Sequence, residues 1–132
     1  MLSVLVVDAS VLAPAVGDSG ADGERFRARL RGEQLAGPDL LRLEVLSVLR
    51  RQTAAGLLSQ PQAERAIDDL LDLPLVVFPV ESLLRRIWSL RGNLTVYDAS
   101  YVTLAETLEC TLVTADRRLA NAPGSRCTIE VI

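Results

Sequence analysis

Hydrophobic and polar residues follow two patterns along the chain. Short, continuous apolar runs predict strands buried on both faces, whereas apolar residues that recur every three or four positions predict helices. On this basis we expect strands at Ser3–Val7, Leu75–Phe78, Thr111–Thr114 and Thr128–Ile132, and helices at Glu24–Arg31, Asp39–Ala55, Gln60–Leu73, Ser82–Leu90, Thr95–Glu109 and Asp116–Ala120.

Glycine and proline residues divide these segments. Gly32 and Gly56 end two of the expected helices, and Pro38 stands where a first-turn proline of the following helix belongs. Two glycine-containing stretches, 17–23 and 92–94, are expected to be loops that face a substrate. The alternation of strands and helices predicts an α/β fold with a mainly parallel sheet covered on both faces, in a single domain over residues 1–132.

The composition narrows the class of protein. A chain of 132 residues, 49% of them hydrophobic, is long enough for one core without disulfides or a structural metal. Cys110 and Cys127 lack the spacing of a zinc site, so we expect reduced thiols, with a bridge as the alternative if their strands are neighbours. We find no signal peptide and no apolar run of membrane length, and we therefore expect a cytoplasmic protein.

The basic residues limit the chemistry. The chain contains no histidine, and all 14 of its basic residues are arginine. This excludes Ser-His-Asp triads, histidine-based ribonucleases, a P-loop lysine and a Schiff base, so any catalysis must rest on carboxylates. The net charge of −3 argues weakly against nucleic-acid binding through bulk positive charge, although arginines form local pairs such as Arg117 and Arg118.

Two aspartates follow apolar strands. Asp8 ends the first expected strand, and Asp116 follows the strand at Thr111–Thr114. The carboxyl ends of parallel strands open at the same edge of a sheet, where α/β folds bind their ligands. Each aspartate also has a structural explanation, because aspartate is a preferred helix N-cap.

Two further carboxylates lie on expected helices. Asp98 follows Thr95 in capping-box spacing, yet it shares a helix face with apolar residues. Glu44 lies inside a helix among leucines, where capping does not apply and a buried carboxylate needs an ion or hydrogen bonds. The alternative for Glu44 is that it points to solvent or toward Arg51.

The four carboxylates predict one acidic site for a divalent cation. Mg²⁺ and Mn²⁺ prefer oxygen ligands and retain bound waters, so they can activate a water molecule and stabilise phosphate oxygens. Such a site supports phosphodiester hydrolysis without histidine.

At these residues the chain resembles the PIN-domain nucleases, and in particular the VapC toxins of bacterial toxin-antitoxin pairs. The resemblance covers nearly the whole chain. It rests on Val-Val-Asp8-Ala-Ser10, on Glu44, on Tyr97-Asp98-Ala-Ser-Tyr-Val-Thr-Leu-Ala-Glu, and on Leu-Val-Thr114-Ala-Asp116-Arg-Arg-Leu.

The resemblance implies a three-layer α/β/α sandwich around a mainly parallel sheet and endonucleolytic cleavage of RNA, often tRNA or ribosomal RNA, with Mg²⁺ or Mn²⁺. It also implies a VapB-type antitoxin as partner and a homodimer. By the same resemblance the catalytic metal ligands are Asp8, Glu44, Asp98 and Asp116, with Ser10 and Thr114 as hydrogen-bonding residues behind them. Arg117 and Arg118, beside Asp116, are our candidates for contacts with the RNA backbone.

Two other classes of protein also place an aspartate after an apolar strand, but each requires a residue that this chain lacks. A phosphotransfer receiver or a haloacid-dehalogenase-like enzyme would need a lysine, which this chain lacks. A metal-dependent adhesion site would need a hydroxyl where Leu12 stands. The alternative that remains is a catalytically silent protein of the same fold that serves as an interaction module for a partner protein.

Overall fold

The computed structural model describes residues Ser3–Ile132, and a parallel sheet lies at its centre. Its five strands follow the order β3-β2-β1-β4-β5 across the sheet. The strands are β1 (Val4–Val7), β2 (Gln34–Pro38), β3 (Leu75–Phe78), β4 (Thr111–Thr114) and β5 (Ile129–Val131).

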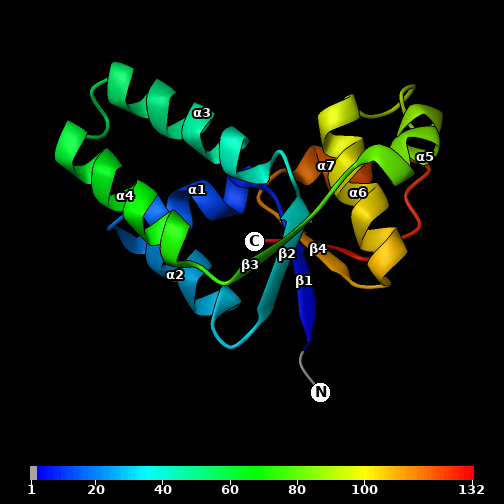
Figure 1. Ribbon diagram of the computed structural model, residues 1–132, viewed down its shortest axis with the longest axis horizontal. Helices are drawn as coiled ribbons and strands as arrows, with labels where there is room; N and C mark the ends of the chain where they lie inside the picture. Colours follow the sequence, from blue (N-terminus) through cyan, green and yellow to red (C-terminus); the bar gives the residue numbers. More distant parts are fainter. Residues whose placement is uncertain (1–2) are drawn as a thin grey trace.

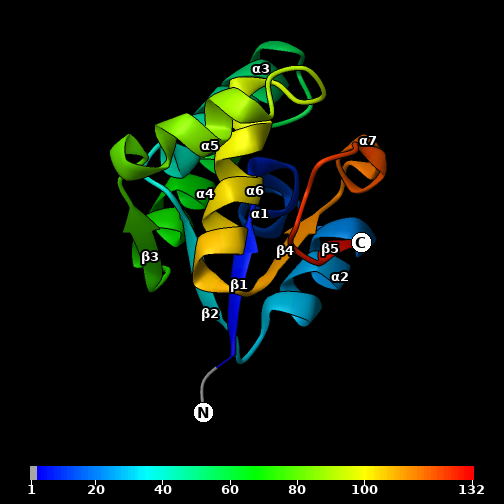
Figure 2. The same cartoon turned by 90° about the vertical axis from the view of Figure 1, so that its right-hand side faces the viewer.

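Helices cover both faces of this sheet. Figure 1 shows α1 to α4 on one side of the strands and α5 to α7 on the other, and in Figure 2 α6 crosses in front of the central strands. The expected three-layer α/β/α sandwich is therefore confirmed. The helices are α1 (Ala9–Gly17), α2 (Ala21–Leu30), α3 (Leu41–Ala54), α4 (Gln60–Asp72), η1 (Glu81–Leu83), α5 (Leu84–Ser89), α6 (Val96–Leu108) and α7 (Arg117–Asn121).

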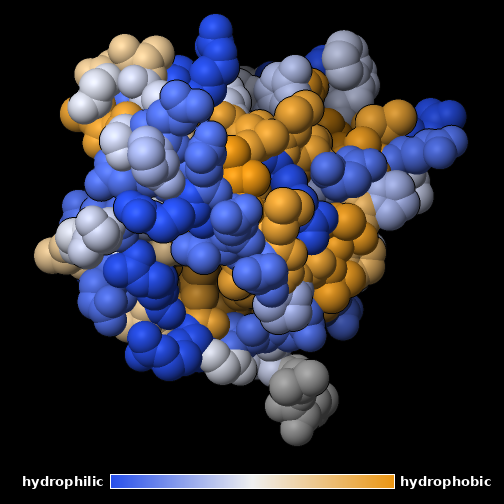
Figure 3. All heavy atoms as spheres, turned by 60° about the vertical axis from the view of Figure 1, so that its left-hand side comes forward, coloured by the Kyte–Doolittle hydropathy of each residue, from blue (hydrophilic) through white to orange (hydrophobic). Residues whose placement is uncertain are grey.

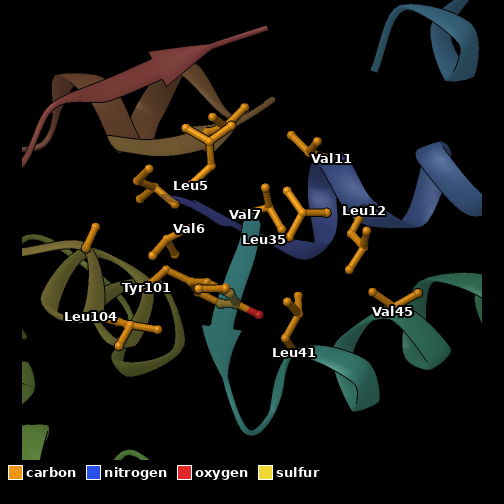
Figure 4. Close-up of a cluster of buried hydrophobic side chains, with 14 of the residues drawn as sticks. Leu5, Val6, Val7, Val11, Leu12, Leu35, Leu41, Val45, Tyr101 and Leu104 are labelled. Atoms are coloured by element: carbon orange, nitrogen blue, oxygen red, sulfur yellow. The ribbon is translucent and has the colours of Figure 1, made fainter. Parts of the chain in front are cut away.

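The core lies on both sides of β1, which is the central strand. Val6 and Val7 are fully buried, and β1 pairs with β2 and β4 on its two sides. Aliphatic side chains of the strands meet those of α1 and α3, and the ring of Tyr101 from α6 lies among them (Figure 4). The core thus fixes α3 and α6 against the same end of the sheet.

Two elements are missing from the sequence-based prediction. Helix α1 directly follows β1 and contains Pro14. Because proline is disfavoured inside helices, the sequence pattern does not predict this helix. Strand β2 carries Gly37 and ends at Pro38, so the prediction that Pro38 begins a helix is wrong. Pro38 occupies the end of the strand, where it pairs with Phe78 of β3.

Other boundaries also differ. The stretch 17–23 is not one loop, because α1 continues to Gly17 and α2 begins at Ala21. The expectation that Leu75–Phe78 is covered on both faces is wrong, since β3 is an edge strand in which Val76 and Val77 are 43% and 37% exposed. The helix expected at Ser82–Leu90 is divided into η1 and α5.

The two cysteines are free thiols, as expected, and both are half-buried. They precede β4 and β5, which are neighbours in the sheet. Burial raises the pKa of both thiols, which favours the protonated form. None of the helices in residues 3–132 has the length and apolar character that a membrane crossing requires.

Candidate active site

All four predicted carboxylates line one pocket at the carboxyl end of the sheet. Asp8 directly follows β1, Asp116 follows β4, and Glu44 and Asp98 come from α3 and α6. The pocket has a volume of about 280 Å³. The chain therefore gathers at one place four acidic residues that are far apart in the sequence.

Asp8 is the most buried of the four, with 7% of its surface exposed. The Ser10 hydroxyl donates to Asp8 Oδ1 at 2.5 Å, and the Thr114 hydroxyl donates to Asp8 Oδ2 at 2.6 Å. Both hydroxyls are held in turn, because Ser10 Oγ accepts from the Ala115 amide and Thr114 Oγ1 from the Asp116 amide. Asp8 is the N-cap residue of α1, as its structural explanation expected, but its side chain makes no capping hydrogen bond and is held by the two hydroxyls instead.

Glu44 is half-buried and points into the pocket. The hydroxyl of Tyr101 donates a hydrogen bond to Glu44 Oε1, and Tyr101 is only 2% exposed. The alternatives that Glu44 points to solvent or toward Arg51 are therefore wrong, since Arg51 donates to the Ser47 hydroxyl. Tyr101 was missed in the sequence as a partner, although it lies one turn after Asp98 on α6.

Asp98 and Asp116 both lie at the N-terminal end of a helix. The Thr95 hydroxyl accepts a hydrogen bond from the Asp98 amide, which caps α6 and leaves the Asp98 carboxylate to line the pocket. Asp116 caps α7 by accepting from the Arg118 amide at 3.0 Å. Its carboxylate also binds the Arg118 guanidinium, with Nε and Nη2 at 3.1 and 2.9 Å. Arg117 is exposed.

The carboxylates differ in their electrostatic environments. Burial raises the pKa values of Asp8, Glu44 and Asp98, and the negative charges of neighbouring carboxylates raise them further. The hydrogen bond and charge of Arg118 instead lower the pKa of Asp116. None of the ion pairs within residues 3–132 involves Asp8, Glu44 or Asp98. Within this part of the chain, these three carboxylates therefore form no salt bridge with a basic side chain.

The donor set fits a hydrated Mg²⁺ or Mn²⁺ ion. All four side chains offer oxygen atoms, and Mg²⁺ is commonly held by one or two carboxylates together with several waters. In the described part of the chain, no three acidic or thiol side chains come close enough together to enclose an ion by themselves. An ion held by these carboxylates would therefore have to keep part of its water shell.

Comparison with known proteins agrees with this fold. The family model described as PIN domain matches residues 5–125, and the chain therefore belongs to the PIN-domain family. Over its length it is similar to VapC ribonuclease Mb0985 of Mycobacterium bovis, with 40% identity over 129 residues and 98% of each chain covered.

Solved structures give the same picture. The chain is similar to PAE2754 from Pyrobaculum aerophilum, with a TM-score of 0.68, 28% identity, and 98% and 84% of the two chains covered. It also resembles VapBC-5 from Mycobacterium tuberculosis, a member of the VapBC family of toxin-antitoxin systems, with a TM-score of 0.60 and 98% of each chain covered. At 18% identity, this second likeness concerns the fold alone.

Proposed function

We propose that the protein is a metal-dependent endoribonuclease that acts as the toxin of a VapBC-type toxin-antitoxin pair. The observation that carries the proposal is the pocket in which four carboxylates meet, three of them with no ion-pair partner in residues 3–132. Membership of the PIN-domain family and the similarity to a protein named VapC ribonuclease support it.

Each side chain has a role that follows from its contacts. Bound Mg²⁺ or Mn²⁺ would activate a water molecule and stabilise phosphate oxygens during hydrolysis. Ser10 and Thr114 hold both oxygens of Asp8, and Tyr101 holds Glu44, so these carboxylates are oriented before a ligand arrives. Asp116 Oδ1 accepts from both the amide and Nε of Arg118, whereas Oδ2 accepts only from Nη2 and keeps a lone pair that could bind a cation.

The proposed substrate is tRNA or ribosomal RNA, and the proposed partner is a VapB-type antitoxin that blocks the pocket. The support is the similarity to a VapC ribonuclease and to a structure from the VapBC family. Because these RNAs are cytoplasmic in bacteria, we propose that the protein acts there.

We further propose a homodimer. Large apolar side chains remain exposed on α3, β3 and α5, and Figure 3 shows a broad apolar area on one face of the molecule. Contiguous exposed apolar surface commonly marks a protein interface. The exposed side chains on these elements are Leu43, Leu46, Val76, Val77, Leu84 and Trp88.

Metal binding separates an enzyme from the alternative, a silent PIN-fold module that only binds a partner protein. Mn²⁺ should raise the thermal unfolding temperature of the purified protein, because a ligand at 100 times its dissociation constant adds about 2.7 kcal/mol to the free energy of unfolding. Asp98→Asn should reduce this shift, whereas Asp68→Asn, which removes the same charge from an exposed position on α4, should not. Equal shifts in all three proteins would favour the silent module.

Activity can be tested in cells. Expression of the wild-type chain alone should slow growth and degrade cellular RNA, and co-expression of the cognate antitoxin should restore growth. Asp8→Asn and Glu44→Gln should abolish both effects, while Asp68→Asn should retain them. Undiminished toxicity of the two pocket variants would contradict the proposed mechanism.

A further inference from the structure

Arg51 lies beside the acidic pocket and was not assigned to it from the sequence. It comes two turns after Glu44 on α3 and lines the same pocket as the four carboxylates. Among the described residues that line this pocket, it is the only basic one. A positive charge at this position would offset the repulsion that an acidic pocket exerts on a polyanion.

The guanidinium group of Arg51 remains available for a ligand. Its Nη1 atom donates to the Ser47 hydroxyl at 2.9 Å, which steadies the side chain along α3. Within residues 3–132 it forms no ion pair, although it lines a pocket that contains four carboxylates. Since a guanidinium carries five N–H donors, a phosphate could still be bound by two of them.

The arginines near Asp116 are less suited to this role. Arg118 uses Nε and Nη2 to bind Asp116, so its charge is already paired with a carboxylate and two of its five N–H donors are engaged. Arg117 and Arg50 are exposed, as Arg51 is, but neither of them lines the pocket. These contacts favour Arg51 over Arg117 and Arg118 as the residue that meets the substrate.

We propose that Arg51 binds a phosphate of the RNA backbone next to the phosphate that is cleaved. Seven residues separate it from Glu44, or about 10 Å along the helix axis between the two backbone positions, and its Nη1 atom is held at Ser47, between them, so we place the Arg51 contact beside the carboxylates, at a neighbouring phosphate. A contact with the backbone positions RNA of any sequence. This inference rests on the proposed ribonuclease function and adds to it the residue that holds the flanking backbone.

Steady-state cleavage of a labelled single-stranded RNA in Mn²⁺ tests the proposal. Arg51→Gln should raise KM by about tenfold with little change in kcat, because a contact present before and during the reaction affects binding alone. Arg51→Lys should recover part of the loss, since lysine keeps the charge without the bidentate fork. The matched control is Arg50→Gln, which removes the same charge one residue away and should leave KM within about twofold of wild type.

Two further measurements distinguish this inference from the proposed function. Calorimetric Mn²⁺ affinity without RNA should be the same in Arg51→Gln and wild type. RNA binding in EDTA, followed by fluorescence anisotropy, should weaken in Arg51→Gln with a salt slope lower by about 0.7. Failure of the wild type to bind Mn²⁺ or cleave RNA would overturn the proposed function, and the anisotropy measurement would then decide the role of Arg51 by itself.

Three results would overturn the inference. The first is that Arg51→Gln has the same KM and the same RNA affinity as the wild type. The second is that Arg50→Gln loses as much RNA affinity as Arg51→Gln, which would indicate an effect of bulk charge rather than a specific contact. The third is a parallel loss of Mn²⁺ affinity in Arg51→Gln, which would assign Arg51 to the ion site.

Discussion

Replacing Tyr101 with phenylalanine removes a single oxygen atom beside the acidic pocket. The ring is 2% exposed and remains in the core, while Glu44 Oε1 loses its hydrogen-bond donor. A hydrogen bond to a charged group contributes about 1.5–3 kcal/mol. That energy concerns the fold; because residues that orient a metal ligand typically change metal affinity by about 10- to 100-fold, we expect Mn²⁺ affinity to fall by about that factor.

Calorimetric titration with Mn²⁺ measures this loss, and urea unfolding in EDTA reports any separate effect on the fold. Tyr97→Phe is the matched control, because it removes the same hydroxyl from a side chain that is 60% exposed. It should bind Mn²⁺ like wild type. If Tyr101→Phe also binds Mn²⁺ within about twofold of wild type, the Tyr101 hydroxyl does not orient Glu44 for a cation.

Three further predictions concern stability and are measured by urea unfolding. Thr114→Val should lower the free energy of unfolding by about 1–3 kcal/mol, because buried Asp8 loses a donor. Gly37→Ala should cost about 1–3 kcal/mol, since the added Cβ would lie 2.4 Å from a side-chain carbon of buried Leu41; no loss would refute this close approach. Burial alone would raise the pKa of Glu106, but hydrogen bonds from Arg86 and the Arg126 amide lower it below the ordinary 4.5. The Arg86–Glu106 pair therefore stabilises the fold above that pH, and this contribution is lost as the pH falls through the lowered pKa. Arg86→Gln should cost about 1–3 kcal/mol near neutral pH and progressively less below the ordinary carboxyl pKa, so a loss independent of pH would contradict the reasoning.

The location of the site could be predicted because it depends on local sequence. An aspartate directly after a buried parallel strand emerges at the edge where the neighbouring strands also end, so Asp8 and Asp116 could be placed together. The partners of the carboxylates could not be predicted. Tyr101 meets Glu44 only because α3 and α6 pack at the same end of the sheet, and residue spacing within a helix does not specify contacts with another helix.

The errors in the fold have a similar origin. Pro38 predicts the first turn of a helix, yet it is the last residue of β2, which also includes Gly37, where Leu41 packs closely. Pro14 likewise belongs to a helix, α1. At these positions tertiary packing overrides local preference, whereas the long periodic segments of α4 and α6 could be recognised from the sequence.

The acidic pocket draws on segments that extend from Asp8 to Asp116, so no short stretch of the chain contains it. During synthesis, Asp116 is joined after the other three carboxylates, and β5 must still be added beside β4. A chain truncated before that point would retain the residues of α3 and α6 without a complete pocket. For a protein proposed to damage its own host, this arrangement restricts the hazard to molecules in which these distant segments have folded together.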